Sequence, residues 1–374
     1  MPRVTTWAER VAAVNAEVAA AGRWRTLRPL GGGGPVHTLP DGRSVVSFAS
    51  NDYLGLSQHP AVGAAATAAI EEWGTGAGAA RLIVGDRPLH HRLEAGLAEW
   101  KGTEDALLFP TGFAANLGVL SALATGDVLV VSDERNHASI IDGCRLARAQ
   151  VVVARHADLG HIAGLLDAHR GPAIVVSDVV FSMDGDVIDL DALGHMCADR
   201  GALLILDEAH AVLQPQWRPT AGLEVVRVGT MSKTLGALGG FVAGSRAMIE
   251  LLVNTSRPFI FTTAPSPPDV AAATAALEIV RGPEGAVLVS RLRSLVDRIA
   301  PGHPSPIIPV IIGDERAATA ASDTLLAEQG LLIPAIRPPT VAPGTSRLRV
   351  ALSAAHTDDQ IELLAKALAG IGGC

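Results

Sequence analysis

Five short apolar runs, each long enough to form a buried strand, are followed directly by residues that could do chemistry. The runs are ALLF at 106–109, VLVV at 128–131, AIVVS at 173–177, LLIL at 203–206 and VVRV at 225–228. The segments after them are PTGFAAN at 110–116, SDERNHAS at 132–139, SDVVFSMDGD at 177–186, DEAHA at 207–211 and GTMSKTLG at 229–236. In open parallel sheets, ligands bind beyond the carboxyl ends of the strands. We therefore expect these segments to meet at one site.

The residue types in these segments suit a phosphorylated aromatic aldehyde held by a lysine, namely pyridoxal 5'-phosphate. The chain has three lysines, Lys101, Lys233 and Lys366, and only Lys233 follows a strand. A lysine in such a site can lower its pKa and attack an aldehyde as the free amine. Asp207 is the carboxylate expected beside the pyridine nitrogen, and His137 is flat enough to cover the ring.

The phosphate would need backbone amides and hydroxyls. Gly112 and Phe113 open a predicted helix, whose first amides favour an anion, and Thr230 carries a hydroxyl. Ser182, Asp184 and Ser232 also follow strands.

Taken singly, each of these residues has a simpler interpretation. Asp207 and His210 could form a buried hydrogen-bonded pair, and His137 could be an ordinary residue at a helix start. A serine or threonine beside a glycine is usually a cap or turn residue, and Lys233 could be a solvated loop lysine. Only their joint placement at strand ends favours a cofactor site.

Other motifs point to functions that their context excludes. DEAH also spells a helicase box, but an ATPase needs the phosphate loop G-x-x-x-x-G-K-[ST], which the chain lacks. GTGAG at 74–78 resembles a dinucleotide fingerprint, but it follows a helical segment and not a strand. His90 and His91 are expected to be a packed or surface pair, and we predict no metal site.

Composition narrows the class of protein. The 374 residues give a prior of about two domains, and 48% are apolar, enough for a large core. A formal charge of −8 disfavours nucleic-acid binding. We expect no signal peptide and no membrane span. Cys144, Cys197 and Cys374 lack the spacing of a metal site or a disulfide framework, so reduced thiols and a cytoplasmic location are expected.

The order of elements predicts an α/β fold. An amphipathic helix is expected over residues 6–22, and glycines at 31–34 break the chain after it. Strands that alternate with helices from residue 104, among them VVVA at 151–154, imply a mostly parallel sheet covered on both faces. Two helices are expected at 269–300, then strands at 307–312 and 347–352, with helices near 316–329 and from Thr357. We therefore predict an N-terminal helix and arm at 1–49, a large cofactor-binding domain at 50–265 and a smaller α+β domain at 266–374.

The sequence resembles the α-oxoamine synthases, pyridoxal-phosphate enzymes of the aspartate-aminotransferase fold (fold type I). The resemblance runs from about Trp7 to the C-terminus. It rests on SNDYLGL at 50–56, GTGAGAARLIVG at 74–85, HHRLE at 90–94, TGFAAN at 111–116, NHAS at 136–139, FSMDGD at 181–186, DEAH at 207–210, GTMSKTLG at 229–236, RPPTVAPGTSRLRV at 337–350 and SAAHT at 353–357.

The resemblance assigns roles to the cofactor site. Lys233 would form the Schiff base, Asp207 would bind the pyridinium nitrogen and His210 the ring 3-oxygen. His137 would stack on the ring with Ser182 nearby. Thr230 would bind the phosphate.

The resemblance also assigns residues to the substrates. Arg349 would bind the amino-acid carboxylate with Asn51 close to it, Arg25 would lie near the acyl thioester, and Thr340 would face the acyl chain. The enzymes of this family are homodimers with the site at the subunit interface, so Thr263 would reach the neighbour's phosphate.

Within the family, RPPTV followed by GTSRLR is similar to the branch that condenses L-alanine with pimeloyl-CoA or a pimeloyl carrier protein in biotin biosynthesis. The alternatives are a sister enzyme that takes glycine and a shorter acyl-CoA, such as a glycine C-acetyltransferase, or a non-catalytic subunit of the same fold. The chain departs from the family in the short segment QPQWRPT at 214–220 after DEAH, and in FTTAPSPP at 261–268.

Overall fold

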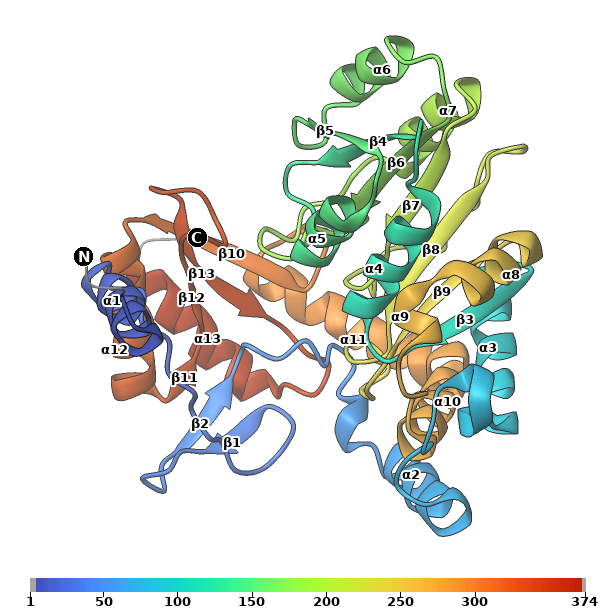
Figure 1. Cartoon of the computed structure of the whole chain (residues 1–374). Helices are drawn as coiled ribbons and strands as arrows, with labels where there is room; N and C mark the ends of the chain where they lie inside the picture. The colour runs from blue at the N-terminus through green and yellow to red at the C-terminus, as the bar shows by residue number, and fades with distance from the viewer. Residues whose placement is uncertain (1–4, 372–374) are drawn as a thin grey trace.

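The computed structural model describes residues 5–371, so Cys374 lies outside the described residues (Figure 1). Its centre is a seven-stranded sheet in the order β3-β9-β8-β7-β6-β4-β5. The strands are β3 (Asp105–Phe109), β4 (Leu129–Asp133), β5 (Gln150–Ala154), β6 (Ala173–Asp178), β7 (Leu203–Asp207), β8 (Val225–Thr230) and β9 (Gly240–Gly244). The six strands expected from the apolar runs are confirmed.

One strand of this sheet, β9, was missed by the sequence reasoning. It lies between β3 and β8 and is antiparallel to both, whereas the other neighbouring strands are parallel. Its sequence, GFVAG, has glycine at both ends and only three apolar residues between them. Glycine weakens an isolated strand, but this strand is buried along its whole length and is stabilised by pairing on both sides.

Helices cover both faces of the sheet. The side chains of β3 show this, because successive residues point to opposite faces and are buried on both. Leu107 and Phe109 pack in one cluster, while Ala106 and Leu108 pack in another on the opposite face. The helices connected to the strands are α2 (Pro60–Trp73), α3 (Pro88–Lys101), α4 (Gly112–Leu123), α5 (Ala138–Leu146), α6 (Leu159–Asp167), α7 (Leu190–Asp199), α8 (Arg246–Thr255), α9 (Arg257–Ile260) and α10 (Pro267–Arg281). Two short helical turns accompany them: η1 (Leu56–Gln58) precedes α2, and η2 (Arg81–Gly85) lies between α2 and α3.

The C-terminal part is a smaller α+β unit. Strands β10 (Ile307–Gly313), β13 (Ser346–Ala351) and β12 (Ala335–Ile336) form an antiparallel sheet in that order. It is accompanied by α11 (Pro283–Ile299), α12 (Glu315–Gln329) and α13 (Asp358–Ile371). A second small sheet joins β1 (Val36–Thr38) and β2 (Ser44–Ser47) to β11 (Leu331–Leu332).

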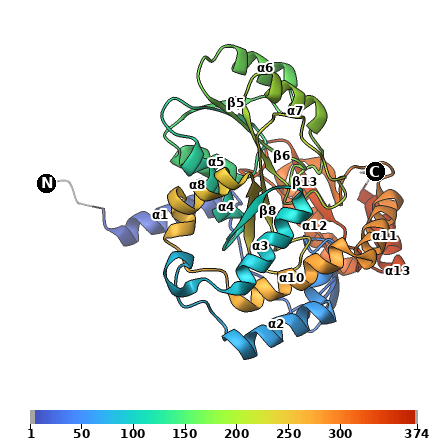
Figure 2. The ribbon, with the colours of Figure 1, turned by 90° about the vertical axis from the view of Figure 1, so that its right-hand side faces the viewer.

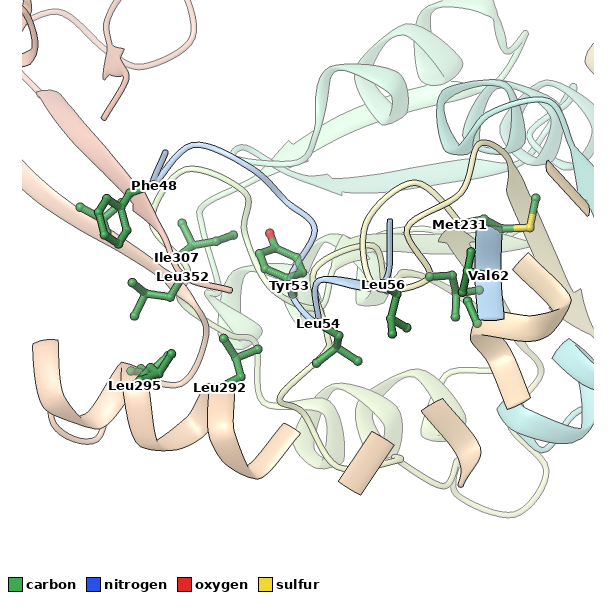
Figure 3. Close-up of a cluster of buried hydrophobic side chains, with 14 of the residues drawn as sticks. Phe48, Tyr53, Leu54, Leu56, Val62, Met231, Leu292, Leu295, Ile307 and Leu352 are labelled. Carbon is green, nitrogen blue, oxygen red and sulfur yellow. The ribbon is translucent and has the colours of Figure 1, made fainter. Parts of the chain in front are cut away.

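Contacts cross both of the predicted domain boundaries. Strand β2 of the N-terminal arm pairs with β11, and α10, beyond residue 265, packs on α2 and α3. One buried apolar cluster extends from Phe48, Leu295 and Leu352 to Met231, and residues 48–62 run through it (Figure 3). The three-part division stays a prediction.

The expected N-terminal helix is α1 (Trp7–Ala20), which Thr6 caps together with Glu9. None of its residues is buried, and Figure 2 shows it extending away from the rest of the chain. Its apolar face, which includes Trp7, Val11 and Val14, is therefore exposed. No helix within residues 5–371 is both long enough and apolar enough to cross a membrane.

Candidate active site

A cavity of about 240 Å³ lies at the carboxyl ends of the central strands. The structure brings there seven of the residues predicted from the strand ends: Gly112, Phe113, His137, Asp207, His210, Thr230 and Lys233. They come from four of the five segments that follow the apolar runs. The fifth, after β6, contributes Asp178 and not the predicted Ser182.

One end of the cavity is formed by hydrogen-bond donors. The Thr111 side chain caps α4 by accepting from the Ala114 amide, at 3.0 Å. The amides of Gly112 and Phe113 donate to no atom in the described part of the chain. A Cβ at Gly112 would come within 3.1 Å of the Thr230 side chain, so glycine keeps this end open. Two free amides at a helix N-terminus form a binding place for an anion.

Thr230 and Ser232 add hydroxyl groups at the same end of the cavity. Their oxygens are 2.7 Å apart, and the Thr230 hydroxyl also donates to the Gly239 carbonyl oxygen at 2.9 Å. Both residues therefore have their oxygens fixed by the turn between β8 and β9.

Two carboxyl groups lie deep in the cavity. Asp207 is buried and accepts from the Asn116 side-chain amide at 2.7 Å and from the Ala209 amide at 2.9 Å. Asp178 accepts from the His137 amide at 2.7 Å. Burial raises the pKa of Asp178 well above its usual range, and repulsion from Asp207 raises it further.

A continuous chain of hydrogen bonds joins Lys233 to Arg349. The Tyr53 hydroxyl donates to Asn51 Oδ1 (3.1 Å), which also accepts from Arg349 Nη2 (3.1 Å). The Tyr53 oxygen then accepts from His210 Nδ1 at 2.6 Å. A neutral His210 protonated at Nδ1 has Nε2 free to accept from Lys233 Nζ at 2.9 Å. The reactive amine and the guanidinium are thus held by one connected set of side chains.

The pKa shifts agree with this arrangement. Burial lowers the pKa of His210 well below its ordinary value, and the positive charge of Lys233 lowers it further. Burial also lowers the pKa of Lys233, although Asp207 and Asp178 partly oppose the shift. Burial likewise lowers the pKa of His137. His210 is therefore neutral at neutral pH, and the Lys233 amine loses its proton more easily than a surface lysine does.

Arg349 is buried on β13 and is oriented by two partners. Its Nε donates to the carbonyl oxygen of Ser182 at 2.6 Å, and its Nη2 donates to Asn51. The family resemblance places Ser182 near the ring of the cofactor. In the structure it is the backbone carbonyl of Ser182 that contacts another predicted site residue.

Three predicted substrate or interface residues do not meet the others. Arg25 is exposed and makes no hydrogen bond or ion pair with any described residue. Thr340 is exposed in a turn, where its amide donates to the Arg337 carbonyl oxygen at 3.1 Å. Thr263 is also exposed and lies outside the cavity. Their roles stay predictions.

The shortened segment after His210 lines a second cavity of about 260 Å³. Glu208, which also lines it, is paired with Lys101 at 2.7 Å and with Arg227. Trp217 donates from Nε1 to Asp191 at 2.8 Å, which ties this segment to α7.

His90 and His91 form a structural pair of one buried and one exposed side chain. His90 is fully buried and its Nε2 lies 2.9 Å from the Pro265 carbonyl oxygen, while His91 is exposed and pairs with Asp86 at 2.6 Å. Within residues 5–371, no three or more His, Cys, Asp or Glu side chains are placed to hold a metal ion.

Four residues that the sequence reasoning did not single out belong to the site. Tyr53 links His210 to Asn51, Asn116 holds Asp207, and Ser139 accepts from Asn116 at 2.9 Å. Asp178 lies at the end of β6. A signal was present for Asp178, because it is the acidic residue that ends a buried strand. Asn116 and Ser139 end two of the segments that follow strands, PTGFAAN and SDERNHAS, whereas Tyr53 reaches the site from a position that no strand end marks.

The residues present fit pyridoxal phosphate. The cavity offers two free amides and two hydroxyls to a phosphate, a buried carboxylate to a ring nitrogen and a lysine to an aldehyde. Asn116 Oδ1, in the cavity wall, is buried and has no hydrogen-bond partner among residues 5–371, so a polar group still has an acceptor there. These groups match the phosphate, the ring nitrogen and the aldehyde of the cofactor.

Comparisons with known proteins identify the family. The family model of class I and II aminotransferases matches residues 43–368. An 8-amino-7-oxononanoate synthase of Anaeromyxobacter dehalogenans is 48% identical, covering 94% of this chain and 92% of that protein. One from Geobacter sulfurreducens is 43% identical, covering 94% and 95%.

Solved structures agree with the sequence relatives. Serine palmitoyltransferase of S. paucimobilis, described with bound PLP and myriocin, has a TM-score of 0.89 at 27% identity and covers 97% of both chains. The 8-amino-7-oxononanoate synthase of Francisella tularensis has a TM-score of 0.72 at 25% identity and covers 88% of this chain and 98% of that one. The expected fold type is confirmed. The chain belongs to the class I and II aminotransferase family and, within it, to the pyridoxal-phosphate-dependent 8-amino-7-oxononanoate synthases.

Proposed function

We propose that this protein condenses L-alanine with a pimeloyl thioester, releases carbon dioxide and forms 8-amino-7-oxononanoate for biotin biosynthesis. The carbon count agrees with the product for which the relatives are named. Seven carbons of the pimeloyl group and three of alanine, less the one lost as carbon dioxide, give a nine-carbon chain. The amino group then lies beside the new ketone, as positions 8 and 7 require.

The cavity residues would hold the cofactor by its two ends. Gly112 and Phe113 amides, with the Thr230 hydroxyl, take the phosphate. Asp207 takes the protonated ring nitrogen, and His137 covers one face of the ring. When bound, the cofactor supplies an electron sink for the carbanion formed at the α-carbon of the amino acid.

Lys233 is assigned both the covalent attachment of the cofactor and the movement of the α-proton. Its lowered pKa favours the neutral amine that attachment needs. His210 accepts from Lys233 Nζ and takes the position beside the ring oxygen. Because His210 is held neutral, it orients the amine without adding a second positive charge.

Arg349 is assigned to the carboxylate of alanine. It is buried and aimed by Ser182 and Asn51, and a guanidinium binds a carboxylate with fixed geometry. Arg25 and Thr340 are assigned to the acyl thioester by family resemblance alone. Comparing product formation from pimeloyl-CoA and from a pimeloyl carrier protein decides between these two acyl donors.

A homodimer with the site at its interface is part of the proposal. Exposed apolar side chains include Leu82, Ile83 and Val84 of η2, Phe261 directly after α9, which contacts η2, and Phe113 at the cavity. A surface of this kind is typical of an interface between copies. Thr263 of one subunit would then contact the phosphate in the other. Dilution below the dissociation constant of the dimer should release cofactor, which sedimentation and absorbance can follow together.

A cytoplasmic location is supported by the free thiols of Cys144 and Cys197.

The observation that carries this proposal is the hydrogen-bonded chain from Lys233 through His210, Tyr53 and Asn51 to Arg349. It connects the amine proposed to attack the cofactor with the guanidinium proposed to bind the carboxylate. The test is the visible absorption of the cofactor-loaded protein, titrated with L-alanine or glycine and then with pimeloyl-CoA. A response to L-alanine, followed by thioester-dependent product and carbon dioxide, supports the proposal. A response to glycine alone favours the sister enzyme, and failure to bind the cofactor favours a non-catalytic subunit.

Replacing the proposed lysine separates chemistry from folding. Lys233→Ala should abolish turnover and covalent attachment of the cofactor, because no other lysine lines the cavity. Lys366→Ala is the matched control, since that lysine is exposed on α13 and should leave turnover unchanged. Normal activity in Lys233→Ala would refute the assignment.

A further inference from the structure

The turn at residues 181–186 (FSMDGD) joins the two parts of the site. From the C-terminal unit, Arg349 Nε donates to the Ser182 carbonyl oxygen at 2.6 Å, and Arg347 pairs with Asp184. From the loop between β4 and α5, Arg135 also pairs with Asp184, at 3.0 Å. Arg135 lies two residues before His137, which covers the proposed ring site. A shift of this turn would therefore move Arg349 relative to His137.

Gly185 lets the turn approach β10 closely. It has a φ of 70°, which side chains rarely adopt, and a Cβ there would collide with the carbonyl oxygen of Ile307. Two backbone hydrogen bonds close the turn, from the Phe181 amide to Asp186 (2.9 Å) and from the Gly185 amide to Phe181 (2.8 Å). The turn is thus short and tightly packed, and contacts to the Asp186 side chain add to those at Asp184 and Gly185.

His156 holds Asp186. Its Nε2 lies 2.5 Å from Asp186 Oδ2 and its Nδ1 lies 3.0 Å from Asp133 Oδ1, so both ring nitrogens face carboxylates. A neutral imidazole has one N–H, whereas an imidazolium can donate to both groups. Its ring also contacts the edge of Phe181, with centroids 4.4 Å apart. Asp133 is anchored in turn by the amides of Arg135 and Ala157.

The charges support the doubly protonated form. Burial lowers the pKa of His156, but the hydrogen bonds and charges of Asp133 and Asp186 outweigh it and raise the pKa to about 9. Glu134 and Arg155 flank the same loop, and Glu134 accepts from the His156 amide at 3.0 Å.

We propose that His156 is a positioning residue for amino-acid binding: by bridging Asp133 and Asp186 it fixes the 181–186 turn, and through the Ser182 carbonyl it fixes the guanidinium of Arg349. This inference rests on the proposed role of Arg349. His156 itself touches neither substrate nor cofactor. Its loss should therefore weaken amino-acid binding specifically.

The test uses Asp186→Ala and His156→Gln in the full-length protein. The Asp186 side chain is 41% exposed, so its removal leaves the fold intact even where His156→Gln does not. Asp167→Ala is the matched control, because Asp167 is also an exposed aspartate paired with one basic residue, Arg200, away from the turn. L-Alanine affinity is measured from the change in cofactor absorbance.

We expect both turn variants to bind L-alanine about tenfold more weakly, because a guanidinium binds a carboxylate well only in the right geometry. The affinity for pyridoxal phosphate and the KM for pimeloyl-CoA should stay within twofold of wild type. Combining the two substitutions should weaken alanine binding no further than Asp186→Ala alone, because they remove the same contact. Asp167→Ala should match wild type.

A second readout needs no cofactor. Amide hydrogen exchange at Phe181 and Gly185 should be about tenfold faster in both turn variants and unchanged in Asp167→Ala. Unchanged alanine affinity and unchanged exchange would overturn the inference, as would an equal loss of affinity for both substrates. If L-alanine does not change the absorbance of the cofactor-loaded wild type, the proposed function is wrong. The hydrogen-exchange rates then still decide whether His156 fixes the turn.

Discussion

Tyr53 is the only tyrosine in the chain, so its ionisation can be followed without interference from other phenols. The side chain is fully buried, and burial raises its pKa to about 12 although the charge of Arg349 opposes this. A phenol in an unfolded chain has a pKa near 10. At pH 11, about one tenth of Tyr53 should be ionised in the folded protein, against about nine tenths in the unfolded chain.

The shift has a consequence for stability. A folded-state pKa above the unfolded value gives stability that is complete below pH 10 and is lost as the pH rises through 12. The shift of two pKa units contributes about 3 kcal/mol to the free energy of unfolding at low pH. About 1.4 kcal/mol of this contribution should be lost at pH 11. The neutral hydroxyl is required because Tyr53 donates to Asn51 while accepting from His210.

The assay is the ultraviolet difference absorbance of cofactor-free protein between pH 9 and 12, with and without urea. Urea unfolding at pH 9 and 11 measures the stability change. Tyr53→Phe is the control for both, since it retains every other group that titrates in this range. It should show no phenolate signal and lose about 1.4 kcal/mol less between these pH values. Half-ionisation of the folded protein near pH 10 would show that Tyr53 is not held as described.

Three further predictions concern stability. Ala157→Gly should stabilise the protein by about 0.5–1 kcal/mol in urea unfolding, because Ala157 has a φ of 50°; a loss of stability would contradict this. Glu94→Ala should cost about 2–3 kcal/mol, because buried Arg81 loses the carboxylate that it contacts at 2.8 and 3.0 Å and keeps only Asp86, whereas exposed Glu99→Ala should cost under about 1 kcal/mol; equal effects would argue against this pair. The raised pKa of His156 gives a contribution to stability that is complete below pH 6.5 and is lost as the pH rises through about 9. Urea unfolding should therefore show that wild type loses more stability than His156→Gln between pH 7 and 10. Parallel pH profiles of the two proteins would refute this prediction.

Much of the candidate site was predictable because parallel strands bring their carboxyl ends to one edge. Lys233, Asp207 and His137 are distant in sequence, yet each follows a buried strand, and the structure places all three in one cavity. The strands themselves were also predictable from local pattern, because a run of apolar residues bounded by polar ones indicates a strand buried on both faces.

The rest depended on contacts that a pattern does not encode. Tyr53 reaches His210 across 157 positions, and nothing in its neighbourhood distinguishes it from a core tyrosine. Strand β9 is defined by its partners on both sides and not by its glycine-flanked sequence. Arg25 and Thr263 were predicted from family resemblance, and both are exposed outside the cavity, because the partners proposed for them are the acyl thioester and the second subunit.

The link between Asn51 and Arg349 spans 298 positions, and this has a consequence for the order of events during synthesis. Asp207, His210 and Lys233 leave the ribosome together, soon followed by β9, which completes the sheet around them. Arg349 emerges much later, and closing so long a loop is slow. A nascent chain therefore contains every residue proposed to hold the cofactor within its own subunit before it contains the arginine proposed to bind the amino acid, so amino-acid recognition is the last part of the site to be assembled.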